Sequence, residues 1–366
     1  MKKLLLIAGM LLVSPFFAAF AVGEQEMPLS AETRVITDAN GTEHIVPANI
    51  ERVVVINRQT AEALVIIGAG DTVVATGDRT TQFNPYLPFE DLPDVGRGSE
   101  VNIELLLTLE PDLVLTHTNR QPQLEGLLEP AGIPVFRIDN YQPATFDDEL
   151  RMLARLFDRE SQAEEFLAWK NEIEDDLAAR VARIPESDRP SVMALSVGFL
   201  NSQGGFRIFP STQLDGTPGV GEGVSTLLAG GVDAASVQWD PAEASTTILV
   251  ETEYVLTRNP EVATLHGTWL GGYNEASENR FHEVLNNIFE VSPIDQVDAG
   301  ANDRLYVFHT DMLGANKRFI GLFRLAQWLH PGPFDDVDPV ALAEEYFERW
   351  IGVPFQGVWW AAASDR

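Results

Sequence analysis

The longest helical pattern in the chain runs from Glu160 to Ile184. No glycine or proline interrupts this stretch, and Pro185 follows it directly, so we expect one helix that ends there. At ~1.5 Å per residue it would exceed ~30 Å, more than packing against one small sheet requires. The pattern predicts a stiff connecting helix over residues 159–184. Its apolar positions recur close to the 3.6-residue period and are Ala163, Phe166, Leu167, Ile173, Leu177, Val181 and Ile184.

Alternating strand and helix patterns fill residues 28–158 and predict an N-terminal α/β lobe. Asn40 and Gly41 lie between two alternating segments, which is a strong hairpin signal. The continuous apolar run at residues 52–56 is typical of a buried parallel strand. In sheets of this kind, ligands meet the loops beyond the carboxyl ends of the strands. Those loops carry Asn57, Arg58, Arg79, His117, Asn119, Arg120 and Tyr141.

Residues 190–366 show a similar order of patterns and predict a C-terminal α/β lobe. We expect strands at Ser191–Val197, at Tyr254–Thr257 and at Leu305–Phe308. Arg258 and His309 would then follow strand ends. The predicted fold class is therefore α/β, with two Rossmann-like lobes whose central sheets are mostly parallel, joined by one long α-helix.

The composition narrows the classes of partner. The 366 residues carry a formal net charge of −30 and include no cysteine. A nucleic-acid partner is not expected, because phosphate binding needs a basic surface. Disulfides, cysteine–zinc sites and thiol catalysis are excluded. The acidic residues are dispersed, so we interpret the charge as a contribution to solubility.

The N-terminus has the pattern of a secretory signal peptide at residues 1–21. Lys2 and Lys3 precede a short apolar run, and the small residues Ala19 and Ala21 stand where cleavage is expected. The alternative is that the segment is kept as an anchor, although the run is short and interrupted by Pro15. We therefore expect a periplasmic protein, secreted through a cleaved signal peptide.

Five stretches, each weak alone, occur in an order that resembles a known family. They are Ile36–Thr42 with Ile50–Ile56, Asp94–Glu104, Leu109–Leu115, Ala131–Val135, and Ala326–Pro331 with Glu345–Phe347. Over nearly all of its mature length the chain resembles the periplasmic substrate-binding proteins of ABC importers for iron–siderophore, haem and cobalamin. In that family one rigid helix joins the two lobes.

The resemblance implies a monomer that binds a small-molecule metal chelate, needs no cofactor of its own and docks on an ABC importer permease. A ferric siderophore is the first expectation for the ligand. Cobalamin, haem, an oxyanion and a bare metal ion remain alternatives, since cleft loops vary independently of the scaffold. One stiff helix also implies limited lobe movement on binding.

The family docks on its permease through one exposed carboxylate on each lobe. The first position maps onto Glu104. The second is expected within residues 244–249, where this chain has Thr246 and Thr247, with Glu243 and Glu251 off register. The chain thus departs from the family pattern on the second lobe.

Three arginines and four aromatic residues are candidates for holding the ligand. Arginine offers a planar fork of donors for anionic oxygens, and the alternative for each is a surface salt bridge. The aromatic residues would cover a large ligand, and the alternative for each is core packing. The candidates are Arg58, Arg79, Arg258, Tyr141, Trp239, Trp269 and Tyr273.

Two of the six histidines, His117 and His309, follow predicted strands and are candidate ligand contacts. Direct metal binding would need a cluster of histidine and carboxylate ligands, so we assign no metal site. The sequence also lacks the common motifs of hydrolases and nucleotide-binding enzymes, so no catalytic residue is assigned. A secreted hydrolase and a sensor or adhesion protein are the alternatives from other classes.

Overall fold

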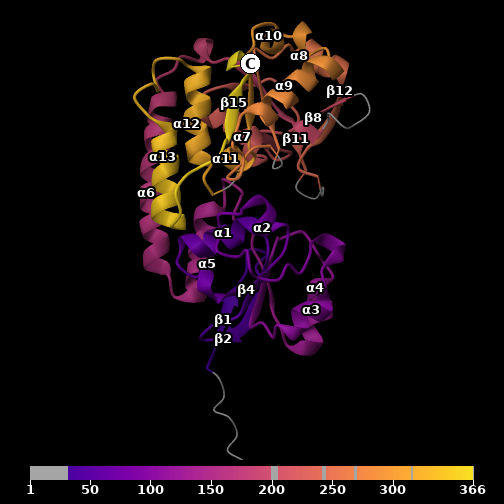
Figure 1. The fold of residues 1–366 in the computed structure, drawn as a ribbon, viewed down its shortest axis with the longest axis vertical. Coiled ribbons are helices and arrows are strands. Elements are labelled where there is room, and N and C mark those ends of the chain that lie inside the picture. The colour runs from indigo at the N-terminus through magenta and orange to yellow at the C-terminus, as the bar shows by residue number, and fades with distance from the viewer. Residues whose placement is uncertain (1–31, 199–204, 241–244, 268–269, 315, 366) are drawn as a thin grey trace, which may run out of the picture.

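The computed structural model describes residues 32–198, 205–240, 245–267, 270–314 and 316–365. The predicted signal peptide and Trp269 lie outside these ranges. Figure 1 shows two α/β lobes, one above the other, with a long helix along one side. The predicted fold class is confirmed.

The N-terminal lobe is built on a four-stranded parallel sheet in the order β4-β3-β5-β6. Every residue of β3 and β5 is buried, because helices cover both faces of the sheet. The predicted hairpin is present, with β1 antiparallel to β2. The strands are β1 Thr33–Thr37, β2 Glu43–Pro47, β3 Val53–Ile56, β4 Val73–Thr76, β5 Leu113–Thr116 and β6 Val135–Arg137. The helices are α1 Arg58–Ile66, α2 Thr80–Phe83, α3 Ile103–Thr108, α4 Leu124–Leu128 and α5 Phe146–Phe157.

Asparagine side chains begin two of these helices. The Asn57 side chain accepts hydrogen bonds from the amides of Gln59 and Thr60 at the start of α1. Asn102 accepts one from the amide of Leu105 at the start of α3. Because α1 begins directly after β3, this cap fixes Arg58 at the carboxyl edge of the sheet.

The predicted connecting helix is α6, Glu160–Val181, which has 22 residues. It ends three residues before the predicted end at Ile184. The ring of Phe166 packs against Phe146 of the N-terminal lobe and against Trp350 near the C-terminus. The apolar face of α6 is therefore buried against both lobes.

The C-terminal lobe has a seven-stranded mixed sheet in the order β12-β8-β7-β13-β14-β15, with β10 paired to β7. Its centre is parallel, whereas β8, β12 and β15 pair antiparallel at the edges. The strands are β7 Ser191–Ser196, β8 Gly205–Ile208, β10 Val232–Asp233, β12 Ile248–Glu251, β13 Val262–His266, β14 Leu305–Phe308 and β15 Trp360–Ala362, with a separate pair β9 Thr212–Gln213 and β11 Gln238–Trp239. The helices are α7 Gly221–Leu228, α8 Thr252–Arg258, α9 Asn279–Val291, α10 Asp298–Ala301, α11 Asp311–Gly314, α12 Arg318–Leu329 and α13 Pro339–Tyr346.

One predicted strand is wrong. Residues 254–257 form part of helix α8, and the buried strand β13 follows after Pro260. A short apolar run fits a helix or a strand equally well, and here Val255 alone of the helix is buried. Arg258 therefore ends a helix rather than a strand.

A second helix braces the lobes beside α6. In Figure 1, α13 runs next to α6 along the same side of the molecule. The Tyr346 hydroxyl at the end of α13 donates to Glu62 of α1 at 2.6 Å, and Phe347 packs edge-on against Tyr86. The main hydrophobic core is accordingly continuous along this side of both lobes. Relative movement of the lobes must work against these contacts as well as against α6.

Within the described residues, no helix combines the length and the apolar character needed to cross a membrane.

Candidate functional site

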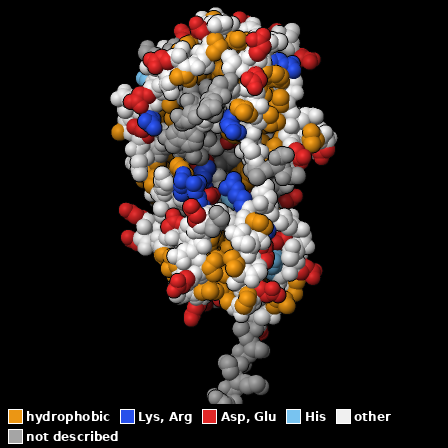
Figure 2. Space-filling model, turned by 90° about the vertical axis from the view of Figure 1, so that its right-hand side faces the viewer, with side chains coloured by type: hydrophobic (Ala, Val, Ile, Leu, Met, Phe, Trp, Pro, Cys, Tyr) orange, Lys and Arg blue, Asp and Glu red, His pale blue; other side chains and the backbone are white. Residues whose placement is uncertain are grey.

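The carboxyl edges of the two central sheets face each other across a cleft between the lobes. Figure 2 shows Lys and Arg side chains gathered on the face where the lobes meet. Two adjoining hollows make up the cleft, and Tyr141 lines both. The inner hollow, about 160 Å³, is lined by Arg58, Gln59, Asp78, His117, Arg120, Tyr141, Val220, Glu222, Thr246, Thr310 and Gly314. The outer hollow, about 360 Å³, is lined by Ala39, Asn40, Thr118, Asn119, Asp139, Tyr141, Gln142, Ala144, Thr145, Glu149, Gln213, Pro218, Gly219 and Trp239.

The loops on the N-terminal side have an unusual backbone. Asp78 and Arg79 after β4, Gln121 after β5 and Asn140 after β6 all have positive φ angles between 49° and 59°. Residues other than glycine adopt this conformation infrequently and at some cost in energy. Residues with this backbone conformation are often found together at ligand-binding sites. Here they lie at the carboxyl edge of one sheet.

Arg58 joins the lobes at the inner hollow. Its Nη1 lies 2.7 Å from Oδ2 of Asp311 on α11, and both side chains are buried. Burial alone would lower the pKa of Arg58, but the charge and the hydrogen bond of Asp311 raise it overall. Burial likewise opposes ionisation of Asp311, yet Arg58 and Lys317 hold its pKa well below the usual range. The pair is therefore charged at any pH near neutrality.

A second ion pair lies deeper in the same joint. The ammonium group of Lys317 lies 2.8 Å from Glu62 of α1, and neither side chain is more than 1% exposed. The Tyr86 hydroxyl donates to the same carboxylate at 3.0 Å. This network links α1 to the start of α12 and fixes the back of the cleft.

His117 is held between two carboxylates. Its Nδ1 lies 3.3 Å from Asp139 and its Nε2 lies 3.4 Å from Asp78. Burial raises the pKa of Asp78 and Asp139, but their hydrogen bonds to His117 lower both below the usual value. Arg120 adds a guanidinium 3.9 Å from Asp78. The wall of the inner hollow thus alternates basic and acidic groups.

Tyr141 stands where the two hollows meet. Its ring lies edge-on to His117, with 6.1 Å between the centroids. Burial, with the nearby charge of Asp139, raises the pKa of Tyr141 to about 12. The hydroxyl is therefore a neutral donor at physiological pH and can bond to an anionic oxygen.

The structure brings several predicted ligand residues to the cleft. Arg58, His117 and Tyr141 line the inner hollow, and Trp239 lines the outer one. Trp239 is buried and its indole N–H donates to the carbonyl of Ser245. Arg79 is exposed, next to Asp78, and shares the Phe83 ring with Arg58 as a cation–π partner at 5.9 Å.

Three other predicted residues lie elsewhere. Tyr273 stacks on Phe347 in the aromatic joint between the lobes. His309 is buried edge-on against Trp359. Arg258 packs over the Tyr254 ring at 5.1 Å, in a surface hollow of the C-terminal lobe that α8 lines. None of the three lines either hollow of the cleft.

The candidate docking residue Glu104 is exposed in the first turn of α3. On the other lobe, Thr246 lines the inner hollow, and Glu251 is exposed at the end of β12. Glu243 lies outside the described residues. Residues 244–249, where this chain lacks the expected docking carboxylate, therefore contribute a side chain to the cleft.

Among the residues that the structure describes, no three or more His, Asp or Glu side chains are grouped to hold a metal ion. The two ring nitrogens of His117 already face carboxylates, which accounts for its position without a metal.

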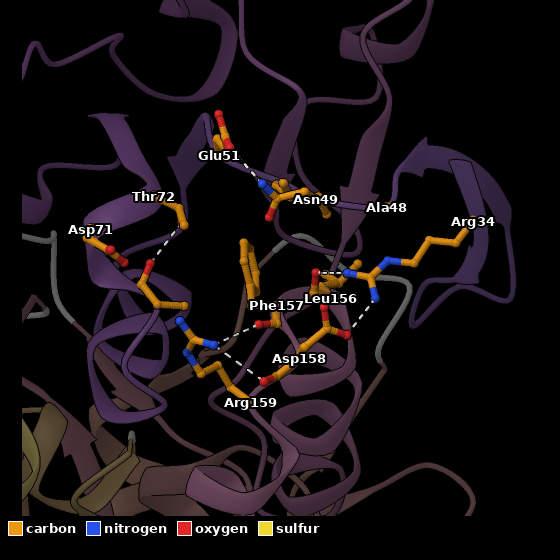
Figure 3. A pocket seen from close by; sticks show the side chains of 12 residues that line it. Arg34, Ala48, Asn49, Glu51, Asp71, Thr72, Leu156, Phe157, Asp158 and Arg159 are labelled. Carbon is orange, nitrogen blue, oxygen red and sulfur yellow. Dashed lines mark hydrogen bonds and ion pairs between the residues drawn. The ribbon is translucent and has the colours of Figure 1, made fainter. Parts of the chain in front are cut away.

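A further polar hollow, about 320 Å³, lies in the N-terminal lobe away from the cleft (Figure 3). Arg34 donates to the carbonyl of Leu156, and Arg159 donates to those of Phe157 and Asp158. Both arginines thus satisfy carbonyls at the end of α5, where the chain turns into α6. We assign this hollow a structural role.

Sequence reasoning missed the acidic residues that line the inner hollow, Asp78 and Glu222, and those that line the outer hollow, Asp139 and Glu149. One signal for Glu222 was available, because this acid stands between Gly221 and Gly223 in a glycine-rich segment. A Cβ at position 223 would lie 2.3 Å from the carbonyl oxygen of Pro210. Glycine at position 223 lets α7 pack closely against the backbone at Pro210, and this packing places Glu222 in the hollow.

A comparison with family profiles identifies one that is described as "Periplasmic binding protein" and matches residues 53–309. Two curated proteins illustrate the relatives. A cobalamin-binding protein of Halobacterium salinarum is 27% identical over 231 residues, which is 62% of this chain and 56% of the relative. A probable siderophore-binding lipoprotein of Bacillus subtilis, YfiY, is 26% identical over 141 residues, or 38% and 43% of the two chains. The chain thus spans about half the length of these relatives.

Solved structures with the same fold cover nearly the whole chain. The TroA-like periplasmic binding protein FepB from Veillonella parvula aligns with a TM-score of 0.69 at 20% identity, over 90% of this chain and 99% of that one. The molybdate-binding protein MolA of Haemophilus influenzae, bound to molybdate, aligns with a TM-score of 0.69 at 19% identity, over 89% and 100%. At these identities the likeness shows the fold.

Proposed function

Because the chain belongs to the periplasmic binding protein family, we propose that it is an exported binding protein that holds a ferric siderophore between its lobes and delivers it to an ABC importer. Members of this family bind and deliver ligands rather than catalyse reactions, and they carry no cofactor of their own. The alternative of a secreted hydrolase is therefore not retained.

The observation that carries the proposal is the group of three arginines at the cleft of so acidic a chain. The net charge is −30, yet Arg58 and Arg120 line the inner hollow and Arg79 lies beside it. An anionic chelate would be repelled by most of this surface, so guanidinium groups must attract and orient it at the cleft.

The size and lining of the cleft suit a metal chelate. The two hollows together fall in the ~300–1,000 Å³ range that is typical of small-molecule sites. Tyr141 and Trp239 supply aromatic surface next to the basic groups. A bare metal ion is a less favoured ligand, because both ring nitrogens of His117 already face carboxylates, those of Asp78 and Asp139.

Cobalamin is the second candidate ligand. The specific observation in its favour is the longer match, 231 residues, to the cobalamin-binding relative, compared with 141 residues for the siderophore-binding one. The outer hollow would have to accept the corrin ring, and Trp239 would then lie near it.

A binding panel tests the ligand. Tryptophan fluorescence and calorimetry would be measured with a ferric tricatecholate, a ferric trihydroxamate, cyanocobalamin, haem and molybdate. We expect saturable binding of a ferric chelate at or below micromolar concentration. Tighter binding of cyanocobalamin than of either ferric chelate would favour the second candidate, and binding of none of them would contradict the proposal.

The proposal includes the export route and the partner. The pattern at residues 1–21 supports secretion through a cleaved signal peptide, and we propose a monomer in the periplasm. Glu104 is exposed on α3, which suits a contact with the permease, since exposed charges guide orientation and association rate.

A further inference from the structure

Glu222 is a buried carboxyl in the inner hollow to which the proposed function gives no role. It lies in the first turn of α7, and 7% of its surface is exposed. Helix α7 and Gly314 hold it closely, because a Cβ at position 314 would come within 2.9–3.1 Å of the carboxyl group. The carboxyl group is therefore packed against the end of α11, at the wall of the hollow.

Charged and titratable groups face Glu222 from every side of the hollow. Arg58 projects from α1, Asp311 from α11 and Tyr141 from the loop after β6. Asp78, His117 and Arg120 complete the lining from the loops after β4 and β5. Arg58 already forms an ion pair with Asp311 at 2.7 Å, and Arg120 lies 3.9 Å from Asp78.

Glu222 has no comparable counter-ion. Among the described residues, no ion pair and no hydrogen bond to another side chain involves its carboxyl group. Burial raises the pKa of Glu222 to about 7, with a further rise from Asp311 and a partial offset from its own amide and Arg58. Near neutral pH the group is thus balanced between a carboxylate and a neutral acid.

The carboxylate and the neutral acid of Glu222 have opposite effects on the binding of an anion. The carboxylate places a negative charge in the hollow into which an anionic ligand must enter. The neutral acid removes that charge and offers an O–H donor to an anionic oxygen. An anion in the hollow must therefore favour the protonated form, and by linkage a proton on Glu222 must favour the anion.

We propose that Glu222 determines the charge specificity of the cleft by taking up one proton from solvent when an anionic ligand enters the inner hollow. The inference rests on the proposed function and adds that the chelate bound in this cleft is an anion. The affinity for an uncharged ligand changes little when Glu222 is protonated. The dependence of affinity on pH therefore distinguishes anionic from uncharged ligands.

Two ferric chelates of similar size and different charge provide the test. A ferric tricatecholate carries three negative charges, and a ferric trihydroxamate without added charged groups carries none. Calorimetry at pH 7 in two buffers of different ionisation enthalpy counts the protons taken up on binding. Since Glu222 is already about half protonated at pH 7 in the free protein, we expect the wild-type protein to take up about half a proton per bound tricatecholate. Its affinity should be about tenfold weaker at pH 8 than at pH 6.

Glu222→Gln keeps the shape of the side chain and cannot titrate. We expect this variant to bind the tricatecholate with no proton uptake and with equal affinity at pH 6 and pH 8. Glu253→Gln, which removes an exposed charge on α8, controls for net charge and should keep the wild-type proton count. With the trihydroxamate, wild type and Glu222→Gln should show the same small dependence on pH.

Glu149 is the rival proton acceptor, because burial also raises its pKa to about 7. Its carboxylate accepts from the Asn140 amide and the Thr145 hydroxyl. Loss of proton uptake in Glu149→Gln but not in Glu222→Gln would overturn the assignment. An unchanged proton count in Glu222→Gln would also overturn it while leaving the proposed function intact, and so would binding of the trihydroxamate without binding of the tricatecholate or molybdate. Binding of no ligand of the panel at pH 6 would remove both proposals.

Discussion

Arg58 on α1 and Asp311 on α11 form a buried ion pair across the two lobes, with 2.7 Å between Nη1 and Oδ2. The same guanidinium lines the inner hollow. One residue thus belongs both to the joint that holds the lobes and to the surface that would meet a ligand. Occupancy of the cleft and the strength of the joint must therefore influence each other.

Breaking this pair should destabilise the protein strongly. In Asp311→Asn, Arg58 would remain buried without its carboxylate, and we expect a loss of about 3–5 kcal/mol in the free energy of unfolding. The double variant Arg58→Gln/Asp311→Asn should lose less than the sum of the single variants. Urea unfolding measures each value.

The exposed pair of Arg349 and Glu165, at 2.9 Å, is the matched control for that experiment. Its loss in Glu165→Gln should cost about 1 kcal/mol or less, because both side chains are exposed, at 42% for Arg349 and 62% for Glu165. Equal losses in Glu165→Gln and Asp311→Asn would show that the inter-lobe pair has no special role.

Arg79 should matter for binding and not for folding. It is exposed and has a left-handed backbone at φ 59°, so Arg79→Asn removes the charge while keeping a residue that tolerates this conformation. We expect binding of a ferric tricatecholate to weaken by about 1–2 kcal/mol, roughly 5–30-fold, with an almost unchanged Tm. Arg183→Gln, an exposed arginine just beyond α6, should leave the affinity as it is, and a large fall in Tm for Arg79→Asn would mark Arg79 as structural.

The stability of the protein should depend on the protonation of Glu222. Burial raises its folded pKa to about 7 from the usual value of 4.5 for a glutamate. The stabilising form is protonated, so this contribution is fully present below pH ~4.5 and is lost as the pH rises through ~7. Relative to Glu222→Gln, the wild-type free energy of unfolding should fall by an amount on the order of 3 kcal/mol between pH 5 and pH 8.

Denaturant titrations of both proteins across this range measure that difference. Glu149 has a similar raised pKa and remains in both proteins, so it cancels in the comparison. Parallel curves for wild type and Glu222→Gln would show that Glu222 titrates as an ordinary exposed acid.

Glu104 should contribute to delivery and not to ligand binding. It is exposed on α3 and makes no contact with either hollow. With a cognate permease in liposomes, Glu104→Arg should reduce ligand-stimulated ATP hydrolysis several-fold, and ligand affinity in solution should be unchanged. Full stimulation by the variant would remove Glu104 from the docking surface.

The predictable parts of this molecule depend on local pattern and on sheet topology. The spacing of Phe166, Leu167 and Leu177 defines one face of a helix, and α6 buries all three. Arg58 and His117 could be placed because each follows a strand of a parallel sheet, and parallel strands end at one edge.

The unpredicted parts depend on contacts between distant segments. Lys317 and Glu62 are 255 positions apart, and neither has a local partner that would predict a buried pair. Glu222 reaches the hollow because α7 packs closely on Pro210 and Gly314, which no periodicity reveals. The same limit explains the error at residues 254–257, where burial against the sheet decided between helix and strand.

The most direct measurement for the whole account is an anomalous difference map at the iron edge, from crystals grown with a ferric tricatecholate. We predict one strong iron peak between the lobes, within reach of the side chains of Arg58, Tyr141 and Glu222. An iron peak on an outer surface of either lobe, with both hollows of the cleft filled by solvent, would contradict the account.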